Sequence, residues 1–155
     1  MHEEILKQLF CDFFKEPCEV ILQLPQAGSD RIYFRLKSST KSAIGTYGKD
    51  TKENDTFIHH TLHFSKLNIA VPHIYTVSDD RQYYLQEDLG DTALYAIIKK
   101  EGISENVKKY LKEVLVQLAN LQIAGAANFD FNTCYPIQEF NRSSMFWDLN
   151  SFKYY

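Results

Sequence analysis

Alternation of apolar and polar residues predicts five short β-strands in the first 89 residues of the chain. The pattern is clearest after a turn-rich loop, where Ile32, Phe34 and Leu36 are apolar and alternate with Arg31, Tyr33 and Arg35. This period of two is typical of a strand with one buried face. Together with the turn residues between the apolar runs, it predicts strands over residues 18–24, 31–36, 42–47, 68–77 and 81–89.

Apolar residues at helical spacing predict a helix over residues 2–15, which Pro17 ends, and another over residues 51–67. From residue 90 onward only helical spacing is found. It predicts helices over residues 91–100, from Ser104 as N-cap to about Gly125, and from Met145 onward. The order of these elements predicts an α+β fold in two parts, residues 1–89 and residues 90–155.

The composition limits the classes of function. The 155 residues, 45% of them hydrophobic, are enough for one domain with a sizeable core. A net charge of −3 gives no general attraction to nucleic acid or anionic membranes, and no apolar run is long enough to span a bilayer. The charged N-terminus is unlike a signal peptide, and the three cysteines have no spacing motif. We therefore expect reduced thiols in a cytoplasmic protein.

The segment LPQAGSDRIYFRL places a turn-rich loop at residues 25–30 between two predicted strands. Gly28 can take a positive φ angle, and the backbone N–H groups of such a loop can face phosphate oxygens. Ser29 would add a hydroxyl group, and Arg31 or Arg35 a bidentate positive charge. The alternative is an ordinary hairpin whose arginines lie in solvent.

The chain resembles the small lobe of kinases of the aminoglycoside phosphotransferase and choline-kinase-like superfamily. Three features carry the resemblance: the order of the predicted elements, the loop segment above, and the segment NIAVPHIYTVSDDRQYYLQEDLGD. Within it the chain is most similar to bacterial kinases that phosphorylate N-acetylmuramate and N-acetylglucosamine. The resemblance covers nearly the whole chain. It implies a protein-kinase-like small lobe, with a five-stranded antiparallel sheet and a helix, then a hinge and the first helices of the large lobe. It also implies ATP as cofactor and a small amino sugar or aminoglycoside as substrate of the intact protein.

The resemblance further implies a nucleotide site. It places main-chain contacts to the base at Gln86 and Asp88, in the hinge after the last strand. Glu53 resembles the helix glutamate that pairs with a third-strand lysine in kinases, but the third strand here, SAIGTY, has no lysine. We therefore expect Arg31 or Arg35 to take over the phosphate contact, or phosphate binding to be weak. The alternative for Glu53 is an acidic residue that stabilises the N-terminus of its helix.

The catalytic segment of the superfamily, HxD followed by Asn or Gln and then a metal-binding Asp, is not found in this chain. We therefore expect neither the catalytic base nor the magnesium ligands here, and a chain that corresponds to the front part of a kinase. Two classes of function stay open. One is the nucleotide-binding part of an ATP-dependent phosphotransferase, and the other is a non-catalytic kinase-like module. A third interpretation is an unrelated α+β domain with a similar strand order.

His59, His60 and His63 lie on one predicted helix, but no cysteine or acidic residue completes a set at known zinc spacing. We therefore expect surface or packing histidines and no metal. The aromatic residues from Phe129 onward lack a basic groove, so we expect them in a core or an interface rather than stacked on bases. The apolar stripe after Ser104 and this aromatic tail predict a homodimer through the C-terminal helices.

Overall fold

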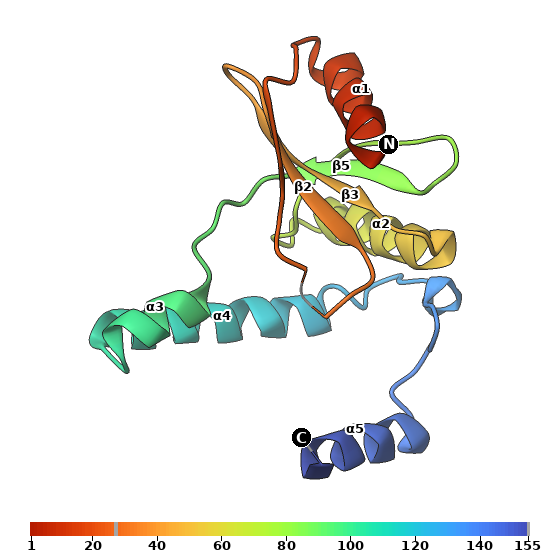
Figure 1. The fold of residues 1–155 in the computed structure, drawn as a ribbon. Coiled ribbons are helices and arrows are strands. Elements are labelled where there is room, and N and C mark those ends of the chain that lie inside the picture. The colour runs from red at the N-terminus through yellow and green to blue at the C-terminus, as the bar shows by residue number, and fades with distance from the viewer. Residues whose placement is uncertain (27, 155) are drawn as a thin grey trace.

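The computed structural model describes residues 1–26 and 28–154. Ala27, in the predicted phosphate loop, and Tyr155, the last aromatic residue of the tail, lie outside the described residues. Within the described ranges the protein is an α+β structure with one five-stranded antiparallel sheet and five α-helices (Figure 1). The α+β fold and the antiparallel sheet predicted from the sequence are therefore confirmed.

The elements follow the predicted order. They are α1 (His2–Phe14), β1 (Val20–Gln23), β2 (Ile32–Lys37), β3 (Ser42–Tyr47), α2 (Thr51–Lys66), β4 (Ile74–Val77), β5 (Tyr83–Glu87), α3 (Leu94–Glu101), α4 (Glu105–Ile123), a 3-10 turn (Phe131–Thr133) and α5 (Arg142–Tyr154).

Three predicted boundaries are wrong by three residues or more. α3 begins at Leu94 rather than at residue 91. β4 contains only the last four residues of the strand predicted over 68–77. Asn68 has a φ angle of 57°, which no strand residue adopts, and Pro72 has no N–H group to donate to a neighbouring strand. At the C-terminal end, α5 begins at Arg142 rather than at Met145. There the carboxamide oxygen of Asn141 accepts hydrogen bonds from the first N–H groups of the helix.

One face of the sheet, which we call the α1 face, carries the main core. Leu6 and Phe10 of α1 are fully buried there with Phe34 of β2 and Leu85 of β5. Gly45 of β3 lies between these two strand residues in the pairing register. A Cβ atom at Gly45 would lie only 2.9 Å from a methyl carbon of Leu6. α1 therefore packs so closely on β3 that any side chain there would displace its neighbours.

The opposite face, which we call the α2 face, is apolar under α2 and polar beside it. Ile58 of α2 forms a second buried cluster with Ile74 of β4 and Tyr84 of β5. Arg31 and Arg35 also lie on this face, because the residues that alternate with them point towards α1. The alternation predicted for the strand after the loop is therefore confirmed.

The start of α2 is fixed by two polar side chains. The Asp50 carboxylate caps the helix and accepts a hydrogen bond from the N–H of Glu53 at 3.3 Å. Asn54, which is fully buried, donates to the carbonyl oxygens of Gly48 at 2.8 Å and Arg81 at 2.9 Å. These bonds join the turn before α2 to the turn between β4 and β5. The position of Glu53 relative to the sheet is thereby fixed.

The chain then leaves the sheet along a linker to α3 and α4, which pack on each other (Figure 1). The predicted N-cap of α4 is confirmed, since the Ser104 hydroxyl accepts a hydrogen bond from the Val107 N–H at 3.1 Å. Figure 1 shows α5 standing apart from the sheet, and none of its described residues is buried. No helix among the described residues has the length and apolar character needed to cross a membrane.

Candidate functional site

The loop between β1 and β2 has the backbone geometry of a tight turn. Gly28 has a φ angle of 62°, as its expected role in the loop requires. The Ser29 hydroxyl accepts a hydrogen bond from the Arg31 N–H at 3.2 Å, and the Ser29 carbonyl accepts one from the Gln26 side chain at 3.2 Å. Ser29 therefore shapes the loop through its acceptor atoms, while its hydroxyl hydrogen is still available for a ligand.

Arg31 connects this loop to α2. Its guanidinium group lies 3.1 Å from a carboxylate oxygen of Glu53 and donates to the Glu53 carbonyl oxygen at 3.1 Å. It also stacks over the Phe57 ring, with its central carbon 5.4 Å from the ring centroid. The Arg31 side chain is only 12% exposed, so the packing of α2 determines where it points. Glu53 is therefore an ion-pair partner as well as a residue of the first helical turn.

A shallow polar depression lies in front of this ion pair. It is lined by Gln26, Gly28, Ser29, Asp30 and Glu53. Three of the seven expected site residues, Gly28, Ser29 and Glu53, thus line this depression, and Arg31 is joined to it through its ion pair with Glu53. Its two carboxylates offset the charge of Arg31, so the depression has no strong positive potential of its own. The described residues contain no group of three or more His, Cys, Asp and Glu side chains that could hold a metal ion.

The other three expected residues lie at the far end of the same sheet face. Arg35 is four residues from Arg31 on one strand, a separation of about 13 Å. Its guanidinium group binds both carboxylate oxygens of Asp88, at 2.8 and 2.9 Å, and a carboxylate oxygen of Asp91 at 2.8 Å. The hydroxyl group of Ser42 also donates to Asp88. Arg35 thus ties the linker after β5 to the middle of the sheet.

The electrostatics of this group are those of a closed ion pair. Burial opposes ionisation of Asp88, but hydrogen bonds from Ser42, the Gly90 N–H and Arg35 outweigh it and lower the Asp88 pKa. The hydrogen bonds to Asp91 and Asp88 raise the pKa of Arg35. Asp88 therefore uses its side chain within the protein, whereas the sequence analysis expects its main chain to contact a base.

Gln86 lies in a row of residues that crosses the α2 face. The register pairs Leu22 with Arg35, Arg35 with Ile44, and Ile44 with Gln86. Residues paired in this way have side chains on one face. The side-chain oxygen of Gln86 is buried and has no hydrogen-bond partner among the described residues. Gln86 therefore lies on the same face as Arg35, with Ile44 between them.

Leu22 is the residue of this row that the sequence analysis did not select. It is 55% exposed, although Ile44 in the same row is buried. An exposed leucine beside a buried isoleucine gives the row an apolar end. The alternation in the first strand, read together with its pairing to Arg35, is the signal that would have identified it.

The third strand supplies no cation to this face. Ile44 and Thr46 are its residues on the α2 side, and Gly45 faces α1. Thr46 is fully buried and its hydroxyl oxygen has no partner among the described residues. Arg31 is the cation that pairs with Glu53. The phosphate contact expected of Arg31 or Arg35 stays a prediction.

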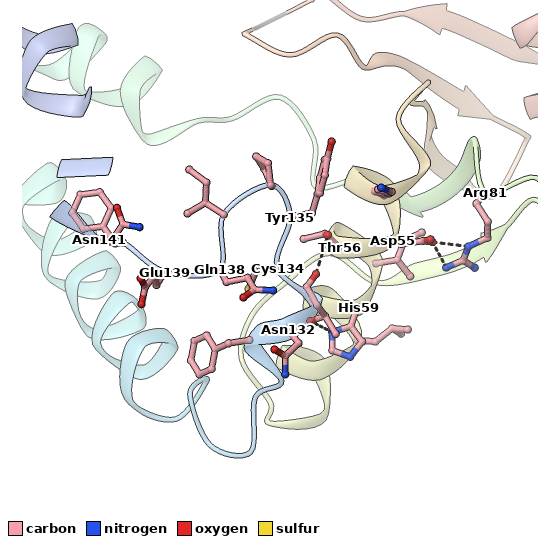
Figure 2. Close-up of a pocket in the computed structure, with 18 residues that line it drawn as sticks. Asp55, Thr56, His59, Arg81, Asn132, Cys134, Tyr135, Gln138, Glu139 and Asn141 are labelled. Atoms are coloured by element: carbon pink, nitrogen blue, oxygen red, sulfur yellow. Dashed lines mark hydrogen bonds and ion pairs between the residues drawn. The ribbon is translucent and has the colours of Figure 1, made fainter. Parts of the chain in front are cut away.

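A larger cavity lies elsewhere. It is an open groove of about 1400 Å³ between the outer side of α2 and residues 131–141 (Figure 2). Its walls are joined by hydrogen bonds of Thr133, whose carbonyl oxygen accepts from Thr56 at 3.0 Å and whose hydroxyl lies 3.1 Å from His59. On α2 itself, Asp55 forms an ion pair with Arg81 at the edge of the groove. Residues far apart in sequence build this groove, and the sequence analysis did not predict it.

The three histidines of α2 are packing residues. His63 lies 2.9 Å from the carbonyl oxygen of Gly125, and His60 lies 3.6 Å from the sulfur of Cys134. All three imidazole rings lie near the ring of Phe129. They join α2 to the segment that follows α4.

A scan against protein-family models matches no family, and a search of curated proteins finds no match. The resemblance to amino-sugar kinases stays a prediction.

Proposed function

We propose that this chain is the nucleotide-binding part of an ATP-dependent small-molecule phosphotransferase, of the aminoglycoside phosphotransferase type, whose substrate is an amino sugar. The ion pair between Arg31 and Glu53 is the observation that carries the proposal. It joins the strand after a glycine-containing loop to the helix that packs on the sheet. The polar depression in front of it is where the phosphates would lie.

At the phosphate end, the loop contributes backbone N–H groups and the Ser29 hydroxyl hydrogen. Arg31 contributes a guanidinium group that Glu53 and Phe57 hold in one orientation. Phosphoryl transfer depends mainly on positioning and charge neutralisation. A cation fixed by its neighbours loses little side-chain entropy when a phosphate binds, which favours the contact.

At the base end, the row from Leu22 to Gln86 supplies an exposed apolar side chain and an unpartnered carboxamide oxygen. The exocyclic amino group of adenine is a donor that suits this oxygen. Arg35 holds the linker through Asp88 and Asp91. In this role Arg35 positions the hinge, and Arg31 is the residue that contacts phosphate.

The chain lacks the HxD segment and a metal site among its described residues. We therefore expect it to bind nucleotide without transferring phosphate by itself. Incubation with ATP, magnesium and N-acetylmuramate should give no turnover above a buffer control. Clear turnover would mean that catalytic groups were assigned wrongly.

ATP binding, measured by calorimetry, tests the proposal. Arg31→Ala should weaken binding about tenfold or more, because a hydrogen bond to a charged group contributes roughly 1.5–3 kcal/mol. Arg81→Ala is the matched control, since Arg81 also pairs with an acidic residue of α2 but lies at the groove on its outer side. The control should bind ATP as the wild type does. A wild-type chain that binds no ATP, or an Arg31→Ala variant that binds equally well, would refute the proposal.

The second candidate is a non-catalytic kinase-like module. It is favoured by the observation that β3 has no cation on the α2 face. The gene sequence downstream of residue 155 discriminates between the two. An HxD segment followed by Asn and Asp supports the phosphotransferase, and a stop codon supports the module.

We also propose that the chain self-associates through α4 and α5. Trp147 is 72% exposed and Phe152 is 88% exposed, and α4 adds a group of exposed aliphatic residues: Val114, Leu115, Val116 and Leu118. An aromatic side chain buries about 150–250 Å², and a stable interface needs about 800 Å² per partner. The two helices together offer an area of that order. Light scattering over a concentration series should show dimers of the wild-type chain, and a smaller dimer fraction for a Trp147→Ser/Phe152→Ser variant. A wild-type chain that is monomeric at every concentration would exclude this interface.

A further inference from the structure

We propose that Cys134 is a covalent modification site for α,β-unsaturated carbonyl compounds, with His60 as its proton acceptor. Cys134 lies in the segment after the 3-10 turn, at the wall of the groove between α2 and residues 131–141 (Figure 2). Its sulfur is 3.6 Å from the Nε2 atom of His60. A thiol beside an imidazole nitrogen, with open space next to it, is an arrangement that favours thiol addition.

Neighbouring contacts hold the two reacting groups together. His59 and His63, on either side of His60, contact Thr133 at 3.1 Å and the Gly125 carbonyl oxygen at 2.9 Å. These contacts fix α2 against the segment that carries Cys134. The rings of His60 and Phe129 meet edge to face, with centroids 4.9 Å apart. The distance from sulfur to Nε2 is therefore set by packing on both sides.

The imidazole is in the form that can accept a proton. Burial, with smaller contributions from the neighbouring His59 and His63, lowers the pKa of His60. A lowered pKa favours the neutral imidazole, which accepts the thiol proton in the tautomer that carries its own hydrogen on Nδ1. Cys18 differs from Cys134. Cys18 donates its S–H to the Val20 carbonyl oxygen, and burial raises the pKa of its thiol.

The addition is balanced without a further reactant. The thiol proton moves to Nε2 of His60 while the sulfur forms a bond to the β carbon of the unsaturated carbonyl compound. The π electrons of the carbon–carbon double bond move towards the carbonyl group, and the resulting enolate takes a proton back at its α carbon. No group leaves and nothing is oxidised. The adduct then lies in the groove, beside residues such as Tyr135 and Gln138.

The test uses N-ethylmaleimide in limiting amounts, with mass spectrometry to follow each cysteine over time. All three cysteines are partly exposed, so Cys11 and Cys18 are internal references for access to the reagent. We expect Cys134 to react at least tenfold faster than either of them. His60→Gln should slow Cys134 at least fivefold and leave Cys11 and Cys18 unchanged. His73→Gln, at a histidine that packs on Tyr75 instead, should not slow it.

Equal rates at the three cysteines in the wild-type chain would overturn the proposal. So would an unchanged Cys134 rate in His60→Gln. If His60→Gln fails to fold, all three rates rise together, and the wild-type comparison then decides the question. None of these measurements depends on nucleotide, so their failure is distinct from a failure of the proposed ATP binding.

Discussion

The contact between Gly45 and α1 gives a quantitative prediction about stability. An added Cβ atom would lie 2.7 Å from Leu36 Cδ1 and 2.9 Å from Leu6 Cδ2, and both leucines are fully buried. Overpacking of this kind costs about 1–3 kcal/mol. Removing a glycine from a strand recovers roughly 0.5–1 kcal/mol. We therefore expect Gly45→Ala to lower the free energy of unfolding by about 1 kcal/mol, and Gly45→Val by more.

A double-mutant cycle tests whether Leu6 is the neighbour that matters. Leu6→Ala alone should cost about 2–5 kcal/mol, because it leaves a cavity under α1. In Leu6→Ala/Gly45→Val the valine fills part of that cavity, so the double variant should be more stable than the sum of the single effects by about 0.5–3 kcal/mol. Val20→Ala is the control partner, since Val20 is exposed on β1 and should combine additively with Gly45→Val.

Urea denaturation followed by circular dichroism measures each free energy of unfolding. A neutral Gly45→Ala variant, together with additive Leu6→Ala and Gly45→Val effects, would refute the reasoning. In that case α1 would not pack on β3, and the α1 face would be open to solvent or to a ligand.

Four further predictions concern polar groups. Arg35→Met should destabilise the fold by roughly 3–5 kcal/mol, because it leaves the Asp88 side chain, 9% exposed, without its cation. Urea denaturation measures this loss, and the double variant Arg35→Met/Asp88→Asn should recover part of it. The Asp88 pKa is lowered in the fold, so ionised Asp88 stabilises the folded state fully above its unfolded pKa of about 3.9. This stabilisation is lost as the pH falls through the folded pKa. Asp88→Asn should therefore make the free energy of unfolding depend less on pH in the acid range. Burial raises the pKa of Tyr84 to about 12, so the stability that its neutral phenol contributes is complete below pH 10 and is lost as the pH rises towards 12. Between pH 9 and pH 12 the free energy of unfolding of Tyr84→Phe should therefore fall by roughly 2–3 kcal/mol less than that of the wild type. Ser104→Ala removes the cap of α4 and should cost about 1 kcal/mol, seen as a lower melting temperature.

The fold could be predicted from the sequence where local patterns determine it. The alternation around Phe34 and Leu36 reports which face is buried, whatever the rest of the chain does. The run SAIGTY is a strand over the range expected for it, because turn residues limit it on both sides. The prediction was wrong before β4, where apolar residues near Pro72 belong to a loop. A hydrophobic pattern alone does not distinguish a strand from a buried extended loop.

The site could be predicted only in part, because long-range pairing decides which groups meet. The sequence analysis selected both Arg31 and Glu53 but did not predict that they form an ion pair with each other. The contact of Arg35 with Asp91 could not be foreseen, since it depends on the path of the linker after β5. The contact of His60 with Cys134 joins two segments that have no common periodicity.

The two faces of the sheet differ in how closely they are packed and in whether their buried polar atoms have hydrogen-bond partners. The α1 face has no room even for a methyl group at Gly45. On the α2 face, Arg31, Thr46 and Gln86 each have a buried polar atom without a hydrogen-bond partner among the described residues. Each such atom costs about 1–3 kcal/mol of folding stability. The α2 face therefore keeps polar groups unsatisfied within the fold, whereas the α1 face is closely packed.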